Sequence, residues 1–163
     1  MTTDQQLKTA TVTYPADREI QIERILDAPR DRVFATVTNP DLIPEYWGPR
    51  STTVTVETMD VRVGGQWRFL VVDSDGNDTA FRGTYREVSP PERIVQTFEW
   101  EGMPGYVSLE TATYEDLGDG RTKVTTISQF FTPEERDGLV NSGMESGMQE
   151  LYQRLDEVLA RQA

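Results

Sequence analysis

The stretch that decides the fold is the end of the chain, residues 132–161, TPEERDGLVNSGMESGMQELYQRLDEVLAR. It opens with a helix start signal, because Thr132 suits the cap, Pro133 the first position and Glu135 the third. Apolar residues then recur every three or four positions, as in a helix with one buried face. They are Met144, Met148, Leu151, Leu155, Val158 and Leu159. We predict one long C-terminal helix, with a break near residues 141–143.

Upstream of this helix, turn signals separate a series of predicted β-strands. The first strand covers residues 18–26, where period-two alternation puts Ile20, Ile22 and Arg24 on one face. Two short helices follow it. Asp27 is expected to cap the first, with Pro29 in its first turn, and the second spans residues 40–47. The remaining strands are predicted at residues 52–59, 66–72, 79–88, 93–100, 106–115 and 121–131.

Consecutive hairpins make the sheet antiparallel, and the only long amphipathic element that can cover its apolar face is the terminal helix. The predicted class is therefore α+β: a curved antiparallel sheet of about seven strands wrapped around a long C-terminal helix. A strongly bent sheet wrapped around a helix leaves room between them, which is the physical basis for a pocket. Residues 1–17 are expected to form a flexible polar arm, and residues 18–163 one domain.

Composition restricts the function. The 163 residues include no His and no Cys, so we expect no metal site, no thiol chemistry and no cofactor. The net charge of −12 argues against nucleic acid and anionic membranes as partners. No apolar run approaches the ~18 residues of a membrane span, and the first residues lack a signal-peptide pattern. We expect a cytoplasmic protein without membrane insertion; a homodimer is left open.

Five motifs occur in an order that resembles a known family. They are YWGP at 46–49, GGQWRF at 64–69, GTYREV at 83–88 with PPERIV at 90–95, EDLGDGRT at 115–122 and GMESGM at 143–148. Together they resemble the bacterial branch of the START-like (SRPBCC) superfamily that is similar to activator of heat-shock protein 90 ATPase homologues, over about residues 18–159. The resemblance implies a helix-grip fold with a cavity between sheet and helix. Related members bind lipids, sterols or polyketides, and some act as aromatase/cyclases.

The residues expected around this cavity are mostly aromatic. Strand alternation puts Trp67 with Phe69, Phe81 with Tyr85, and Phe98 with Trp100 on shared faces. Plain core packing is the alternative for each of them. Glycines beside the helical methionines indicate either close approach to the sheet or space left for a ligand. The predicted ligand-binding set is Trp47, Trp67, Phe69, Phe81, Tyr85, Phe98, Trp100, Met144, Met148 and Tyr152.

No catalytic motif is visible, so the sequence does not identify an enzyme. Glu99, Glu101 and Glu110 are candidates for a buried acid, and Tyr85, Tyr106 and Tyr114 for a hydroxyl acid. Arg68, Arg82 and Arg86 are expected on the solvated face of the sheet, paired with Glu87, Glu99 or Glu101. The leading hypothesis is binding of a small apolar or amphipathic molecule. The alternatives are a polyketide cyclase/aromatase-type enzyme and a co-chaperone-like interaction domain.

Overall fold

The computed structural model describes residues 9–162, and these form one antiparallel sheet with four helices. The strands are β1 (Thr11–Thr13), β2 (Glu19–Leu26), β3 (Thr53–Met59), β4 (Gln66–Val72), β5 (Asp78–Ser89), β6 (Arg93–Trp100), β7 (Val107–Asp116) and β8 (Thr122–Gln129). The helices are α2 (Arg30–Val37), α3 (Ile43–Tyr46), α4 (Pro133–Asn141) and α5 (Met144–Arg161).

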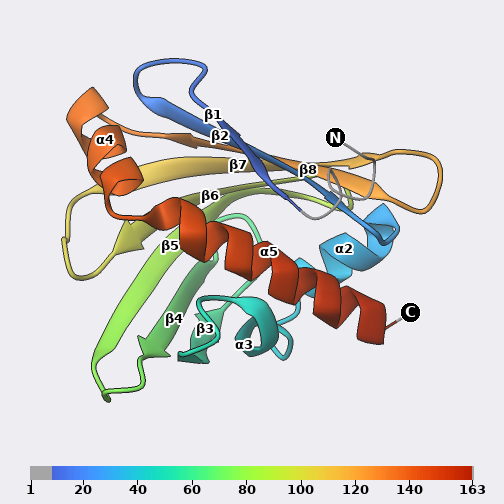
Figure 1. The fold of residues 1–163 in the computed structure, drawn as a ribbon, viewed down its shortest axis with the longest axis horizontal. Helices are drawn as coiled ribbons and strands as arrows, with labels where there is room; N and C mark the ends of the chain where they lie inside the picture. The colour runs from blue at the N-terminus through green and yellow to red at the C-terminus, as the bar shows by residue number, and fades with distance from the viewer. Residues whose placement is uncertain (1–8, 163) are drawn as a thin grey trace.

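The sheet has the strand order β1-β2-β8-β7-β6-β5-β4-β3 and curves around α5 (Figure 1). Strands β3 to β8 form a meander of consecutive antiparallel pairs, and β2 joins it beside β8. Helix α5 crosses the concave face, with α4 near one of its ends and α2 and α3 near the other. The predicted helix-grip class is confirmed, with eight strands rather than about seven.

The additional strand lies in the segment predicted as a flexible arm, residues 1–17. Residues 1–8 of that segment lie outside the described residues. The remainder is partly ordered, because Thr11 pairs with Glu23 and Thr13 with Gln21 across β1 and β2. Just before β1, the backbone of Ala10 exchanges two hydrogen bonds of 2.9 Å with the side chain of Gln149. For residues 11–13 the arm prediction is therefore wrong, since backbone pairing holds them against the sheet.

The core lies between the concave face of the sheet and α5. In β2 every second residue is buried, which confirms the predicted alternation. On α5 the buried apolar residues include Leu155, Val158 and Leu159, three of the six that defined the predicted stripe. The sheet face and the helix face therefore meet as the hydrophobic pattern requires.

The helix ends agree in part with the sequence signals. At Thr132 the capping box with Glu135 is formed, and Pro133 begins α4. The predicted break is present, because Gly143 adopts a φ of 85° between α4 and α5. Asp27 does not cap α2: extended Pro29 is the cap residue, the helix begins at Arg30, and there is no side-chain capping hydrogen bond. The second short helix is limited to α3, shorter than the predicted 40–47. No helix among residues 9–162 is both long and apolar enough to cross a membrane.

Candidate ligand-binding cavity

Three cavities lie along the concave face of the sheet beneath the helices. The large cavity, of about 920 Å³, lies between β6, β7, β8, β2 and the α4–α5 corner. The second cavity, of about 480 Å³, lies between α5, the 47–52 segment and the β4–β5 hairpin. The small cavity, of about 160 Å³, lies deeper, toward α2 and α3. Helix α5 therefore leaves part of the hollow that it spans unfilled.

The mouth of the large cavity is formed by the β6–β7 turn and α4, which lie at the same end of α5 (Figure 1). Trp100, Met103 and Tyr106 line the cavity and are 41 %, 49 % and 54 % exposed. Gly102 leaves room for this arrangement, since a Cβ there would lie 2.3 Å from the ring of Trp100. Large apolar side chains thus surround an opening to solvent, where a guest with an apolar body would first make contact.

Polar side chains occupy the inner wall of the large cavity. Glu110 on β7 stands opposite Gln96 on β6 and Ser128 on β8, so the three share one row across the sheet. Glu110 and Ser128 line the large cavity, and Gln96 lines the small one. Ser128 donates a hydrogen bond of 3.2 Å to the Glu110 carboxylate. One pleat further along β7, Ser108 also lines the cavity. Such a row on a concave, otherwise apolar face is unusual, because buried polar groups cost free energy unless they find partners.

Burial raises the pKa of the Glu110 carboxyl to about 7, and the hydrogen bond from Ser128 opposes this shift. The two other acids proposed from the sequence behave differently. Arg82 lowers the pKa of Glu99, and Arg68 lowers that of Glu101, through direct hydrogen bonds. Of the three, Glu110 is the acid whose pKa is raised, and it alone lines the large cavity.

The predicted hydroxyl acids do not suit proton donation near neutral pH. Burial raises the pKa of Tyr85 to about 12 and raises that of Tyr114 further. Tyr106 is exposed at the cavity mouth. In this cavity a proton could be transferred near neutral pH by Glu110.

Four of the predicted site residues separate the large cavity from the second one. Phe81, Phe98, Met144 and Met148 line both cavities, so the wall between them consists of side chains from the sheet and from α5. The rings of Phe81 and Phe98 lie 5.5 Å apart. Trp47 contacts Phe81 at 5.2 Å and lines the second cavity. The aromatic residues and methionines predicted from the sequence are thus brought together by the fold.

The other predicted residues are placed elsewhere. Phe69, Tyr85 and Tyr152 line the small cavity, and Trp100 stands at the mouth of the large one. Trp67 lines none of the three. It is 2 % exposed, with its ring 4.9 Å from that of Phe69, so its placement is that of core packing. A ligand-binding role for the remaining residues stays a prediction.

The two glycines of the helical GMESGM motif have different roles. Gly143 supplies the positive φ at the joint between the helices. Gly147 lies inside α5 and lines the second cavity, and a Cβ added there would meet no atom within 4 Å. Of the two explanations drawn from the sequence, close approach to the sheet is therefore wrong for Gly147. The space beside it is open, and its use by a ligand stays a prediction.

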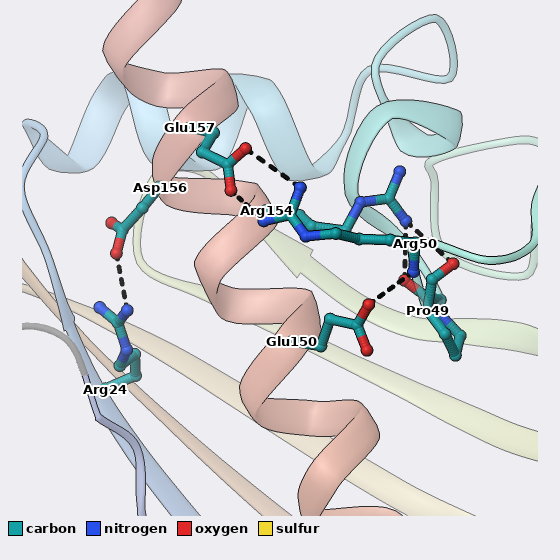
Figure 2. A network of polar contacts seen from close by, with 8 residues as sticks. Arg24, Pro49, Arg50, Glu150, Arg154, Asp156 and Glu157 are labelled. Carbon is teal, nitrogen blue, oxygen red and sulfur yellow. Dashed lines mark hydrogen bonds and ion pairs between the residues drawn. The ribbon is translucent and has the colours of Figure 1, made fainter.

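Polar contacts on both sides of α5 fix its position over the cavities (Figure 2). On one side, Asp156 forms an ion pair of 2.6 Å with Arg24 of β2, which is 2 % exposed. On the other side, Glu157 pairs with Arg50, and Glu150 accepts a hydrogen bond of 2.7 Å from the Arg50 backbone. Arg154 donates to the carbonyl of Gly48 at 2.7 Å. These contacts hold the helix while the space beneath it remains partly open.

The arginines of the middle strands lie on the opposite face of the sheet, as predicted. Arg68 pairs with Glu57 and Glu101, and Arg82 pairs with Glu99. Arg24 of β2 does face inward. Its alternation with Ile20 and Ile22 in the sequence had predicted that it shares their face of the strand. Of the polar row, the sequence analysis named Glu110 as one of three candidates for a buried acid, and it missed Gln96 and Ser128.

Fold and cavities together define a helix-grip protein, in which a curved antiparallel sheet and a C-terminal helix enclose internal space. The family described as activator of Hsp90 ATPase homolog 1-like protein matches residues 27–160, and the chain belongs to this family. The resemblance to the START-like superfamily is thereby confirmed. A search among curated proteins finds no match.

Solved structures show the same fold. A protein from Arthrobacter aurescens is 26 % identical, with a TM-score of 0.84 over 93 % of this chain and 91 % of that one. A protein from Rhodobacter sphaeroides is 24 % identical, with a TM-score of 0.88 over 94 % and 99 %. DynU16, a protein of the dynemicin biosynthetic locus, is 20 % identical, with a TM-score of 0.68 over 90 % of this chain and 48 % of that one.

Proposed function

We propose that this protein reversibly binds a small amphipathic molecule in the large cavity. The observation that carries the proposal is a space of about 920 Å³ that is mainly apolar, opens between exposed aromatic side chains and contains a polar row on one wall. Ligand pockets are typically apolar spaces of about 300–1,000 Å³ with a few converging polar groups. The same combination is expected to fit a guest with an apolar body and one polar end.

The test uses the uncharged fluorophore N-phenyl-1-naphthylamine, whose emission rises in apolar surroundings. Saturable enhancement is expected with the wild-type protein. Met148→Trp should weaken binding at least tenfold, because Met148 lines both larger cavities and the indole would fill space in them. Val63→Trp is the matched control, since Val63 is 65 % exposed and lines none of the three cavities. Circular dichroism establishes that both variants fold. Equal binding by all three proteins would refute the proposal.

A second candidate function is proton transfer of the cyclase or aromatase type. The observation that favours it is Glu110, a carboxyl with a pKa of about 7 inside a cavity, because a general acid or base works best near the ambient pH. Incubation with a short poly-ketone should then give an aromatic product, and Glu110→Gln should abolish that turnover while leaving fluorophore binding in place. Product formation at the uncatalysed rate would reject this candidate.

A further inference from the structure

We infer that the large cavity selects an amphipathic amine, with the ammonium group beside Glu110 and the apolar body against the aromatic and methionine wall. The inference rests on the proposed binding function and names the chemical class of its ligand. It follows from three observations: the polar groups on one wall, the sign of the charges around the cavity and the position of the apolar surface.

The first observation is a set of oxygen atoms that converge on one wall. The Glu110 carboxylate accepts from Ser128, and within residues 9–162 no Lys or Arg pairs with it. The neighbouring Ser108 is 6 % exposed, and its hydroxyl forms no hydrogen bond inside the described part of the chain. An ammonium group carries three donors, and these three side chains offer oxygen acceptors on the same wall. Such a group would supply both the missing charge and the missing partners.

The second observation is that charges of one sign surround the space. Among the described residues that line the large cavity, the acidic side chains are Glu110, Glu134 and Glu135, and no Lys or Arg is present. Glu135 is held in the capping box at the start of α4. The inward-facing Arg24 of β2 does not line the cavity and forms the ion pair with Asp156. An acidic guest would therefore bring a like charge into the cavity without a counter-ion, which is costly in a desolvated site.

The groups around Glu110 are neutral or acidic, which is consistent with the negative charge of the cavity lining. Burial, with a smaller contribution from the charge of Glu110, raises the pKa values of Tyr114 on the same strand and Tyr152 on α5, so both remain neutral. Gln96 on β6 and Ser128 on β8 carry no charge, and the charged residues that α4 contributes to the lining are Glu134 and Glu135. Arg136 of α4 does not line the cavity and pairs with Asp137. In the free protein, burial raises the pKa of Glu110 to about 7, and a bound cation would lower it again. An amine should therefore bind more tightly when Glu110 is ionised.

The third observation concerns the apolar surface. Phe81, Phe98, Met144 and Met148 line the cavity, and Trp100 and Tyr106 reach its mouth. Methionine adapts to guests of varied shape, and aromatic rings offer large apolar surface. Glu110 lies on β7, whereas these two phenylalanines and two methionines form the wall between the large cavity and the second cavity. This arrangement fits a molecule with its charge at one end.

The test measures displacement of N-phenyl-1-naphthylamine by three probes of equal chain length: decylamine, decanol and decanoate. At pH 8.5 the amine should compete at least tenfold better than decanol, and decanoate least well. Glu110→Gln should remove the advantage of the amine, so that decylamine and decanol compete within twofold of each other. Glu92→Gln is the control, because it removes the same charge from an exposed turn.

A second measurement uses wild-type protein alone. Lowering the pH from 8.5 to 6 should reduce the affinity of decylamine relative to decanol about tenfold, because Glu110 becomes mostly protonated. Equal competition by amine and alcohol, or no effect of Glu110→Gln on their ratio, would overturn the inference while decanol displacement still supports the proposed function. Failure of the fluorophore itself to bind would instead reject the proposed function.

Discussion

Replacing Gly147 by alanine should stabilise the protein, because α5 passes over open space at this position. Glycine in a helix interior costs about 1 kcal/mol relative to alanine, and a Cβ at residue 147 meets no atom within 4 Å. We therefore expect Gly147→Ala to increase the free energy of unfolding by about 1 kcal/mol. For a domain of this size the midpoint of thermal unfolding should rise by roughly 2–4 °C.

The matched control lies four residues earlier in the same motif. Gly143 also has open space beside it, but its φ of 85° is strained for any residue with a Cβ. Gly143→Ala should therefore destabilise the protein by roughly 1–2 kcal/mol, the cost of the left-handed conformation. The same chemical change then acts in opposite directions at two positions with equal steric freedom.

Both variants are compared with the wild type by urea unfolding followed by circular dichroism. If Gly147→Ala lowers stability, the added methyl group has met atoms, and α5 packs closely on the sheet where the second cavity is described. That result would refute the reasoning about space beneath the helix. A loss in Gly143→Ala alone would not, because it depends on backbone conformation.

Two further predictions concern the sheet. Gly83→Ala should lower the free energy of unfolding by about 3 kcal/mol or more, measured by urea unfolding. The reason is that its Cβ would lie 2.0 Å from the Thr97 carbonyl oxygen and 2.4 Å from Trp67 Nε1. A variant as stable as the wild type would contradict this packing. Glu110→Gln should change how the free energy of unfolding depends on pH. In the folded protein the pKa of Glu110 is about 7, above the ordinary value of 4.5. The stabilisation from Glu110 is therefore complete below pH 4.5 and is lost as the pH rises through 7. Between pH 4.5 and 8, the free energy of unfolding of the variant should rise by about 2–3 kcal/mol relative to that of the wild type. A constant difference between the two proteins across this range would contradict the raised pKa.

Most of the strands could be predicted because their boundaries coincide with turn residues. The predicted segments 66–72 and 93–100 match β4 and β6 residue for residue. β1 was missed, since three residues are too few to show alternation and their pairing depends on β2, ten residues further on. The misplaced cap of α2 has a similar cause: Asp27 is a good capping residue in general, but the backbone is still extended at Pro29.

The cavity was predicted better than its chemistry. The apolar wall could be found because Phe81, Phe98 and the two methionines follow strand and helix periodicity. Glu110 could not be separated from Glu99 and Glu101, because in β7 the apolar Leu109 lies on the face opposite to Glu110. The buried Tyr114 lies on the same face as Glu110, so alternation in β7 leaves the direction of Glu110 undecided. The curvature of the sheet and the position of α5, which are tertiary features, decide that the polar row faces inward.

The absence of any buried side chain on α4 has a consequence for exchange between the protein and its surroundings. Among the four helices of residues 9–162, α4 alone has no buried residue, and its ends are a capping box and the Gly143 joint. Segments that bury little apolar surface open at a lower free-energy cost than the whole domain unfolds. We therefore expect α4 to separate from its neighbours at a lower cost than global unfolding, while the hydrogen-bonded ladder of the sheet and the anchored part of α5 stay intact.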